Sequence, residues 1–314
     1  MTSASPHRPE PQLIAALVTP FTPNGDVDVA SLTRLVGYLQ QHGVREFFVV
    51  GSTGEAPLLD RRERVTIVET VRQAAPSAII YAGISGSGHR HAIRNANECA
   101  QAGADVVVLM SPYFIALGQD HLVDYCTAVA DASPVPLALY HHLRMPTAFT
   151  IPSVVRLASH PKIVAIKDTA GSQHNRCAEI LTATQGQDFK FFQGVENLTA
   201  STLAAGGHGC VLAQACIAPW LFRGLFDAWQ KGDRSRAEEL QVQIETIWNI
   251  FSTREVKQSF FHFLHTLKLP LHQRGVIAWT ASATPNVKFE PAFDEMITAF
   301  FNRTLKLPPL ANQP

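Results

Sequence analysis

Lys167 is the residue best suited to covalent chemistry, because it directly follows the apolar run 164–166. A lysine at the end of a buried strand loses hydration, which favours its neutral amine, and a neutral amine attacks carbonyl carbons. The adjacent Asp168 supports a second interpretation, in which the two side chains form a structural ion pair at the strand end. Periodicity alone favours the ion pair.

Tyr140 and His141 end another apolar run. A phenol both donates and accepts hydrogen bonds, so Tyr140 is a candidate proton relay to a carbonyl oxygen during imine formation. The alternative is an aromatic side chain that fills the core with its hydroxyl hydrogen-bonded. We expect His141 to form a polar wall near the imine.

The segment 51–55 reads Gly-Ser-Thr-Gly-Glu and follows an apolar run. Gly51 and Gly54 allow a sharp turn and a close approach of the backbone to a ligand. If the segment opens a helix or forms a nest, its N–H groups and the hydroxyls of Ser52 and Thr53 would hold a carboxylate. The alternative is an ordinary turn between a strand and a helix.

These residues need elements that bring strand ends together, and the chain offers a regular strand–helix alternation. Continuous apolar strands indicate burial on both faces, and eight of them predict a (β/α)8 TIM barrel with functional groups at the carboxyl ends of the strands. Gly43 and Gly103 are typical helix stops. An open doubly wound sheet is the second architecture. The expected strands are 13–18, 46–50, 78–82, 105–109, 135–140, 163–166, 189–192 and 209–212, and the clearest helices are 29–41, 61–74, 91–102 and 120–132.

The chain after the barrel changes character. Helices are expected over 233–251, 255–267 and 287–301, interrupted by Pro270, Pro285 and Pro291, and they form an extension that packs on the barrel and supplies subunit contacts. The predicted organisation is therefore a flexible tail over 1–11, a barrel over 12–232, a C-terminal helical extension over 233–303 and a loose tail over 304–314.

Composition excludes several function classes. The 314 residues carry 26 basic and 26 acidic side chains, so neither a nucleic-acid footprint nor a polybasic membrane patch is expected. No apolar run reaches the roughly 20 residues of a membrane span. Five cysteines without Cys-x-x-Cys spacing predict reduced thiols in a cytoplasmic protein.

Ligand spacing predicts neither a metal nor a cofactor. The histidine pairs at 89 and 91, 141 and 142, and 262 and 265 have no carboxylate or cysteine at a spacing that would complete a metal site. The glycine-rich segment 83–88 lies outside the first strand–helix unit, so it is a poor dinucleotide signal.

The chain resembles the dihydrodipicolinate synthase and N-acetylneuraminate lyase family over residues 12–300. This resemblance implies a barrel with C-terminal helices, assembled as a homotetramer of two tight dimers. It also implies that Lys167 forms a Schiff base with pyruvate or another 2-oxo acid, that Ser52 and Thr53 hold the substrate carboxylate, and that Tyr140 relays protons. The motifs that carry it, in the family's order and spacing, are Thr19-Pro20-Phe21, the Gly-Ser-Thr-Gly-Glu segment, Ser111-Pro112-Tyr113, Tyr140 and Ile166-Lys167-Asp168.

Two positions depart from the synthase branch of that family. An arginine five positions after the tyrosine binds a second carboxylate there, whereas here Met145 occupies that position and Arg144 comes one step early. The second of two successive tyrosines completes a proton relay across the dimer interface there, whereas here the pair is Tyr113 and Phe114. Tyr113 is the candidate interface tyrosine that reaches the neighbouring subunit's site.

Three further residues are candidate substrate ligands. Gly194 and Glu196 follow the seventh strand, where sugar-acid lyases of the family carry acidic groups that bind substrate hydroxyls. Glu196 has the alternative of a solvated acid at a helix N-terminus. Gln214, after the eighth strand, is another hydroxyl ligand candidate.

The sequence therefore predicts a class I aldolase that cleaves a 2-keto-3-deoxy sugar acid, or a related hydroxy-oxo acid, to pyruvate and an aldehyde. Two competing activities on the same scaffold are a dehydratase and a dihydrodipicolinate synthase. A different class is a non-catalytic protein that binds 2-oxo acids, against which the intact Lys167 and Tyr140 argue.

Overall fold

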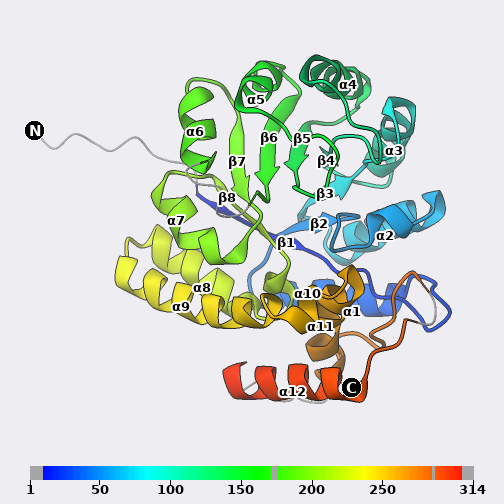
Figure 1. The fold of residues 1–314 in the computed structure, drawn as a ribbon, viewed down its shortest axis with the longest axis vertical. Coiled ribbons are helices and arrows are strands. Elements are labelled where there is room, and N and C mark those ends of the chain that lie inside the picture. The colour runs from blue at the N-terminus through cyan, green and yellow to red at the C-terminus, as the bar shows by residue number, and fades with distance from the viewer. Residues whose placement is uncertain (1–9, 171–175, 285–286, 306–314) are drawn as a thin grey trace, which may run out of the picture.

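The structure, a computed structural model, describes residues 10–170, 176–284 and 287–305 and contains a closed barrel of eight parallel strands (Figure 1). Neighbouring strands pair in chain order, and β1 closes the barrel by pairing with β8. This closure confirms the predicted TIM barrel and excludes the open sheet. The strands are β1 Gln12–Ala16, β2 Glu46–Val49, β3 Ile79–Gly83, β4 Val106–Leu109, β5 Leu137–His141, β6 Ile163–Asp168, β7 Lys190–Gln193 and β8 Gly209–Leu212.

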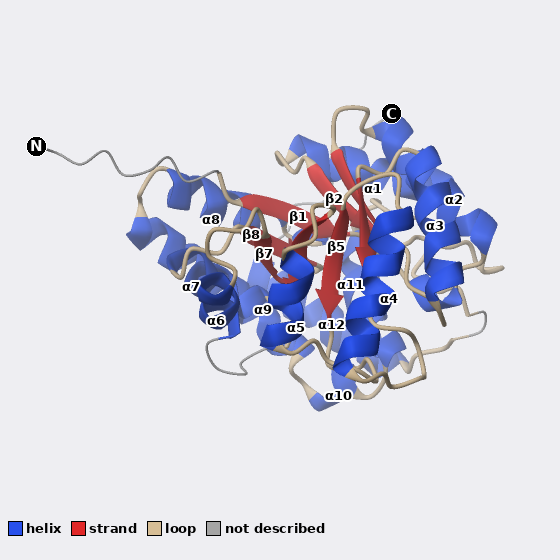
Figure 2. Cartoon of the chain, turned by 90° about the horizontal axis from the view of Figure 1, so that it is seen from above, coloured by secondary structure: helices blue, strands red, loops and turns tan. Residues whose placement is uncertain are grey.

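Helices surround the strands, and Figure 2 shows the sheet in the middle with helical cover on its outside. The barrel helices are α1 Val29–Gln41, α2 Arg61–Ala74, α3 His89–Gln101, α4 Gln119–Ala132, α5 Ile151–Ala158, α6 Arg176–Ala183, α7 Thr199–Ala204 and α8 Pro219–Gln230. Short 3-10 turns η1 Ala56–Leu58, η2 Glu196–Leu198 and η3 Gln214–Cys216 follow β2, β7 and β8.

Local sequence explains where these helices begin and end. The Asp28 side chain accepts the Ser31 N–H and starts α1, while Asp60 and Glu63 form a capping box at the start of α2. The predicted stops Gly43 and Gly103 have φ values of 79° and 107°, a left-handed conformation that glycine adopts readily.

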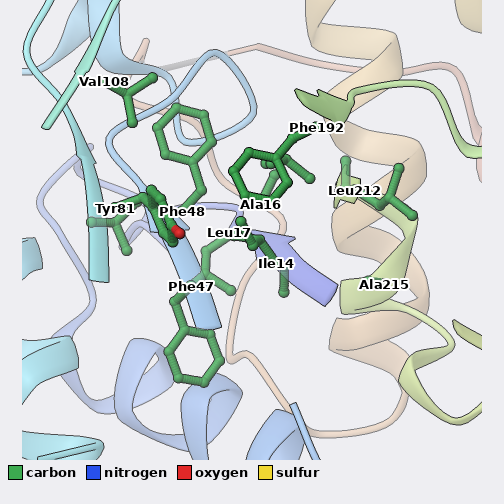
Figure 3. Close-up of a cluster of buried hydrophobic side chains, with 14 of the residues drawn as sticks. Ile14, Ala16, Leu17, Phe47, Phe48, Tyr81, Val108, Phe192, Leu212 and Ala215 are labelled. Carbon is green, nitrogen blue, oxygen red and sulfur yellow. The ribbon is translucent and has the colours of Figure 1, made fainter. Parts of the chain in front are cut away.

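The barrel interior is filled by side chains that alternate along each strand with side chains pointing outward. In β2, Phe47 and Phe48 lie on opposite sides of the strand (Figure 3). One side chain from each strand meets at the centre of the barrel: Ile14, Phe48, Tyr81, Val108, Ala138, Lys167, Phe192 and Val211. Lys167 is the only cation in that layer of otherwise apolar and aromatic groups.

The C-terminal helices differ in detail from the expected ones. The segment 255–267 is divided into α10 Arg254–Lys257 and α11 Phe260–Gln273, because Ser259 is extended and its side chain caps α11. Pro270 lies inside α11 and does not end it. Pro291 opens α12 Pro291–Leu305, which therefore begins later than residue 287. Pro285 lies outside the described residues.

The expected division after residue 232 stays a prediction, and α9 Arg234–Phe251 begins directly beyond it with Asp233 as its cap. Most of the tails expected over 1–11 and 304–314 lies outside the described residues. The five cysteines form no disulfide. Within the described ranges, no helix is both long enough and apolar enough to cross a bilayer.

Candidate active site

Lys167 lies within β6 and points into the mouth of the barrel, with only 6% of its surface exposed. Its Nζ lies 4.2 Å from the ring centre of Tyr140 and 4.9 Å from that of Phe48. Tyr140 is the register partner of Lys167 across the β5–β6 pair, so strand pairing itself puts the amine beside the phenol. The two strongest sequence candidates are therefore neighbours.

Asp168 does not pair with Lys167, so the interpretation of these two residues as a structural ion pair is wrong. Successive residues of a strand point to opposite faces. Asp168 instead accepts hydrogen bonds from the Arg176 guanidinium and from the Ala170 N–H. The Lys167 amine therefore points into the barrel mouth without an ion pair to Asp168, whose carboxylate is bonded to Arg176.

The segment 51–55 forms a tight turn that brings Ser52 to Tyr140. The Ser52 Oγ lies 3.1 Å from the Tyr140 hydroxyl, a distance that fits a hydrogen bond in either direction. Thr53 is buried and lines the same cavity as Lys167. Among the described residues, the backbone N–H groups of Ser52 and Thr53 donate to no acceptor. The turn therefore presents two amides and two hydroxyls beside the amine.

Gly51 and Gly54 shape this turn. A Cβ on Gly51 would lie 2.6 Å from the Phe48 ring, so only glycine fits there. The Gly54 carbonyl accepts a hydrogen bond from the Thr19 hydroxyl at 2.8 Å, which ties the turn to the segment that follows β1. Gly51 thus allows the turn to pack against Phe48, and the Gly54 carbonyl fixes the turn to Thr19.

Gly194 and Glu196 stand on the other side of Lys167. A Cβ on Gly194 would lie 3.0 Å from the Lys167 Cε and 2.4 Å from the Thr169 Oγ1, so the missing side chain makes room for the amine's stem. Glu196 is 5% exposed, which differs from the solvated acid considered as its alternative. Its Oε1 accepts the N–H groups of Ala213 and Gln214 at 2.9 and 3.0 Å.

Burial raises the pKa of Glu196, while its hydrogen bonds with the backbone and the nearby charge of Lys167 oppose that rise. Glu196 lines the cavity, and two backbone N–H groups already occupy its Oε1. These two hydrogen bonds fix the backbone just after the end of β8.

Of the two adjacent histidines, His142 and not His141 lines the cavity. His141 alternates with Tyr140 along β5, and its Nδ1 lies 3.0 Å from the Arg176 Nη2. His142 packs edge-on against the Tyr140 ring with 5.7 Å between centres. Burial first, then Lys167 and Arg144, lowers the pKa of His142 to about 4. The alternation of side chains along a strand was the one feature of the sequence that distinguishes His141 from His142.

The structure does not bring Gln214 or Tyr113 to the cavity. Gln214 is 1% exposed, and neither polar atom of its side chain has a hydrogen-bond partner among the described residues. The Tyr113 hydroxyl is likewise buried without a partner in that set, and burial raises its pKa. Phe114 beside it is 94% exposed and has a φ of 70°.

The cavity has a volume of about 280 Å³ and joins the barrel mouth to the C-terminal helices. Arg144, the arginine one step before the position expected in the synthase branch, also lines the cavity at its exposed edge. The sequence alone did not predict that the C-terminal helices form the wall of the cavity opposite the barrel mouth. The run of aromatic residues after residue 259 was the feature that could have indicated it. The residues contributed by that wall are Trp248, Phe251, Val256, Lys257, Ser259, Phe260 and Phe263.

Metal-ligating side chains do not cluster in the part of the chain that the structure describes: it has no group of three or more His, Cys, Asp or Glu residues that could hold an ion.

Comparison with known proteins identifies the relatives of this architecture. The model of the dihydrodipicolinate synthetase family matches residues 10–297. The chain is 35% identical to the 4-hydroxy-tetrahydrodipicolinate synthase of Acidiphilium cryptum, covering 74% of this chain and 79% of that protein. It is 34% identical to 4-hydroxy-tetrahydrodipicolinate synthase 1 of Streptomyces coelicolor, covering 77% and 78%.

Solved structures show the same arrangement. The YagE protein of E. coli K12 in complex with pyruvate superimposes with a TM-score of 0.87 at 24% identity, over 94% of this chain and 98% of that one, a likeness of fold alone. The dihydrodipicolinate synthase of Acinetobacter baumannii complexed with pyruvate gives 0.85 at 26% identity, over 95% and 100%.

Proposed function

This chain belongs to the dihydrodipicolinate synthetase family, and from that membership we propose that it cleaves a 4-hydroxy-2-oxo acid to pyruvate and an aldehyde through a Schiff base at Lys167. The 2-keto-3-deoxy sugar acids and related hydroxy-oxo acids predicted from sequence fall in this class. The observation that carries the proposal is the buried Lys167 amine, 4.2 Å from the ring of a tyrosine whose hydroxyl meets Ser52.

The first step joins the Lys167 Nζ to C2 of the substrate. The C2 oxygen gains two protons and leaves as water, which produces a protonated imine. The turn at Ser52 and Thr53 is suited to hold the adjacent carboxylate, because both residues line the cavity and their backbone N–H groups have no acceptor among the described residues. The Tyr140 phenol is placed to pass protons to and from the departing oxygen.

The second step breaks the bond between C3 and C4. The C4 hydroxyl passes its proton to the Tyr140 oxygen, which gave up its own proton to the departing water in the first step. C4 becomes the aldehyde carbonyl, and the bonding electrons move through C3 to the imine nitrogen. C3 of the resulting enamine then takes up a proton, and water releases pyruvate and restores the Lys167 amine. Every atom comes from substrate, water and this chain, so the proposed reaction requires no cofactor.

Borohydride reduction in the presence of pyruvate tests the imine. We expect the intact mass to increase by the mass of a reduced pyruvyl adduct, and this adduct to be absent in Lys167→Ala. Pyruvate release from hydroxy-oxo acids then separates the activities: aldehyde with pyruvate indicates cleavage, and loss of water alone indicates a dehydratase. No adduct with any 2-oxo acid would overturn the proposal and favour a binding protein.

The synthase activity is the second candidate, because both curated relatives described above carry that name. Its support is weaker at the distal end of the cavity, where Met145 stands at the position of the expected arginine and Arg144 reaches the cavity from one residue earlier. Robust condensation of pyruvate with aspartate semialdehyde, exceeding cleavage of hydroxy-oxo acids, would establish the synthase instead.

We further propose a cytoplasmic homotetramer built from two dimers. Phe114 and Ile115, 94% and 56% exposed, form an apolar surface beside the partly buried Tyr113, and such a surface suits contact with a second copy. Analytical ultracentrifugation of the full chain tests the assembly, and a monomer at assay concentration would contradict it.

A further inference from the structure

The far side of the cavity is formed by four aromatic side chains, Trp248, Phe251, Phe260 and Phe263, which we call the aromatic wall. They come from α9 and the start of α11, more than 80 residues beyond Lys167 in the chain. They share one cavity with the Lys167 amine. A substrate longer than pyruvate that is bound to Lys167 can therefore reach this wall within the same cavity.

Three of the four rings of the aromatic wall pack against one another. The rings of Phe251 and Phe263 meet edge to face with 5.5 Å between centres, and Phe260 is nearly parallel to Phe263 at 6.4 Å. Phe251 is buried, whereas the other three rings are partly exposed. The partly exposed rings leave apolar surface available to a ligand.

Polar groups near the aromatic wall are poorly suited to a polyhydroxylated chain. Glu196 is the one carboxylate among the described residues that line the cavity, and its Oε1 already accepts two backbone N–H groups. The Ser259 hydroxyl is engaged by His262 at 2.8 Å. Sugar hydroxyls moved from water onto the phenylalanine rings of this wall would lose hydrogen bonds that the rings do not replace. Polar side chains that could bond such hydroxyls, among them Thr169, line the cavity outside the aromatic wall.

Cationic side chains stand at the edge of the aromatic wall. The Arg144 guanidinium lies 5.6 Å from the ring centre of Phe260, within the range of a cation–π contact, and Lys257 also lines the cavity. Both cationic side chains are exposed, so their charges lie toward solvent and the aromatic rings provide the apolar surface of the cavity.

We propose that the group on C4 of the substrate, which leaves as the aldehyde, is an aromatic ring seated against the aromatic wall. This inference rests on the proposed cleavage reaction and names its substrate class as 4-aryl-4-hydroxy-2-oxo acids. A ring gains apolar burial and ring contacts at this wall, which a sugar chain does not. The cavity of about 280 Å³ is near the lower end of small-molecule sites, which suits one ring joined to a pyruvate unit.

The test measures condensation of pyruvate with benzaldehyde and with glyceraldehyde, after borohydride trapping of pyruvate has been measured on the same preparation. We expect kcat/KM for benzaldehyde to exceed that for glyceraldehyde by about tenfold or more, on the scale of a desolvated ring contact. An intact pyruvate adduct with preferred use of glyceraldehyde, or with use of neither aldehyde, overturns this inference alone. No adduct overturns the proposed function itself.

Phe260→Leu assigns the preference to the aromatic wall, because leucine keeps an apolar side chain and removes the ring. We expect kcat/KM for benzaldehyde to fall about three- to tenfold while pyruvate trapping stays unchanged. Phe300→Leu on α12 makes the same substitution at a partly exposed phenylalanine away from the cavity and should leave both readouts unchanged. Equal losses in the two variants would argue against the aromatic wall.

Discussion

Glu55 and Lys268 form a buried ion pair with 2.6 Å between Oε1 and Nζ, although 213 positions separate them in the chain. Their side chains are 0% and 1% exposed. Glu55 ends the turn that carries Ser52 and Thr53, and Lys268 lies in α11, which also carries Phe260. The pair therefore links the turn that carries Ser52 and Thr53 to the helix that carries part of the aromatic wall.

Lys268→Met should destabilise the protein strongly, because it leaves the Glu55 carboxylate buried without its counter-ion. We expect the free energy of unfolding to fall by about 3–5 kcal/mol in urea denaturation. The double variant Glu55→Gln/Lys268→Met should be less destabilised than the sum of the single changes, since the unpaired charge is removed as well. Strictly additive effects would contradict the coupling between the two residues.

Tyr140→Phe should slow pyruvate release by roughly 100-fold, the usual scale for a positioned proton-transfer group. The ring that contacts Lys167 is kept, and only the hydroxyl that meets Ser52 is lost. Tyr125→Phe is the matched control, because its buried hydroxyl has no partner among the described residues. Unchanged turnover in Tyr140→Phe would remove the relay from the mechanism.

Gly194→Ala should impair imine formation more than folding. The added Cβ would lie 3.0 Å from the Lys167 Cε and would displace the amine or the Thr169 side chain. We expect the rate of borohydride trapping with pyruvate to fall by at least about tenfold, in line with the cost of misplacing a reacting group. Gly88→Ala, where an added Cβ meets nothing within 4 Å, provides the control. Equal trapping rates in the two variants would contradict the prediction, because they would show that the added Cβ does not displace the Lys167 side chain.

Stability should decrease in acid through His142. Its pKa is lowered to about 4 in the folded protein, from an ordinary value of about 6.5, so between these pH values the unfolded chain binds more protons. The free energy of unfolding therefore falls as the pH drops from 6.5 toward 4, and His142→Gln should flatten this slope. Burial also lowers the pKa of His141 and His265, so part of the slope should remain.

Urea denaturation at pH 7 and pH 4.5 measures that slope. His89→Gln, at an exposed position on α3, is the control and should leave it unchanged. A His142→Gln variant with the same loss of stability in acid as the parent protein would contradict the prediction.

Local patterns were sufficient to predict the barrel. Continuous apolar strands separated by helices indicate a parallel sheet covered on its outer face, and Asp28, Asp60, Gly43 and Gly103 mark helix ends through contacts within a few residues. Lys167 and Tyr140 could be nominated for the same reason, because a polar residue ending a barrel strand faces the mouth. Their catalytic roles remain predictions.

Long-range packing supplied the rest of the site. Strand alternation turned His141 toward Arg176 and His142 toward the cavity, and Asp168 found its partner in Arg176. The aromatic wall comes from helices that no short-range pattern places over the barrel mouth. The burial of apolar surface drives the packing of these helices, and its free energy depends on the buried area and not on the distance along the sequence. Only the folded chain therefore reveals which distant side chains share a cavity.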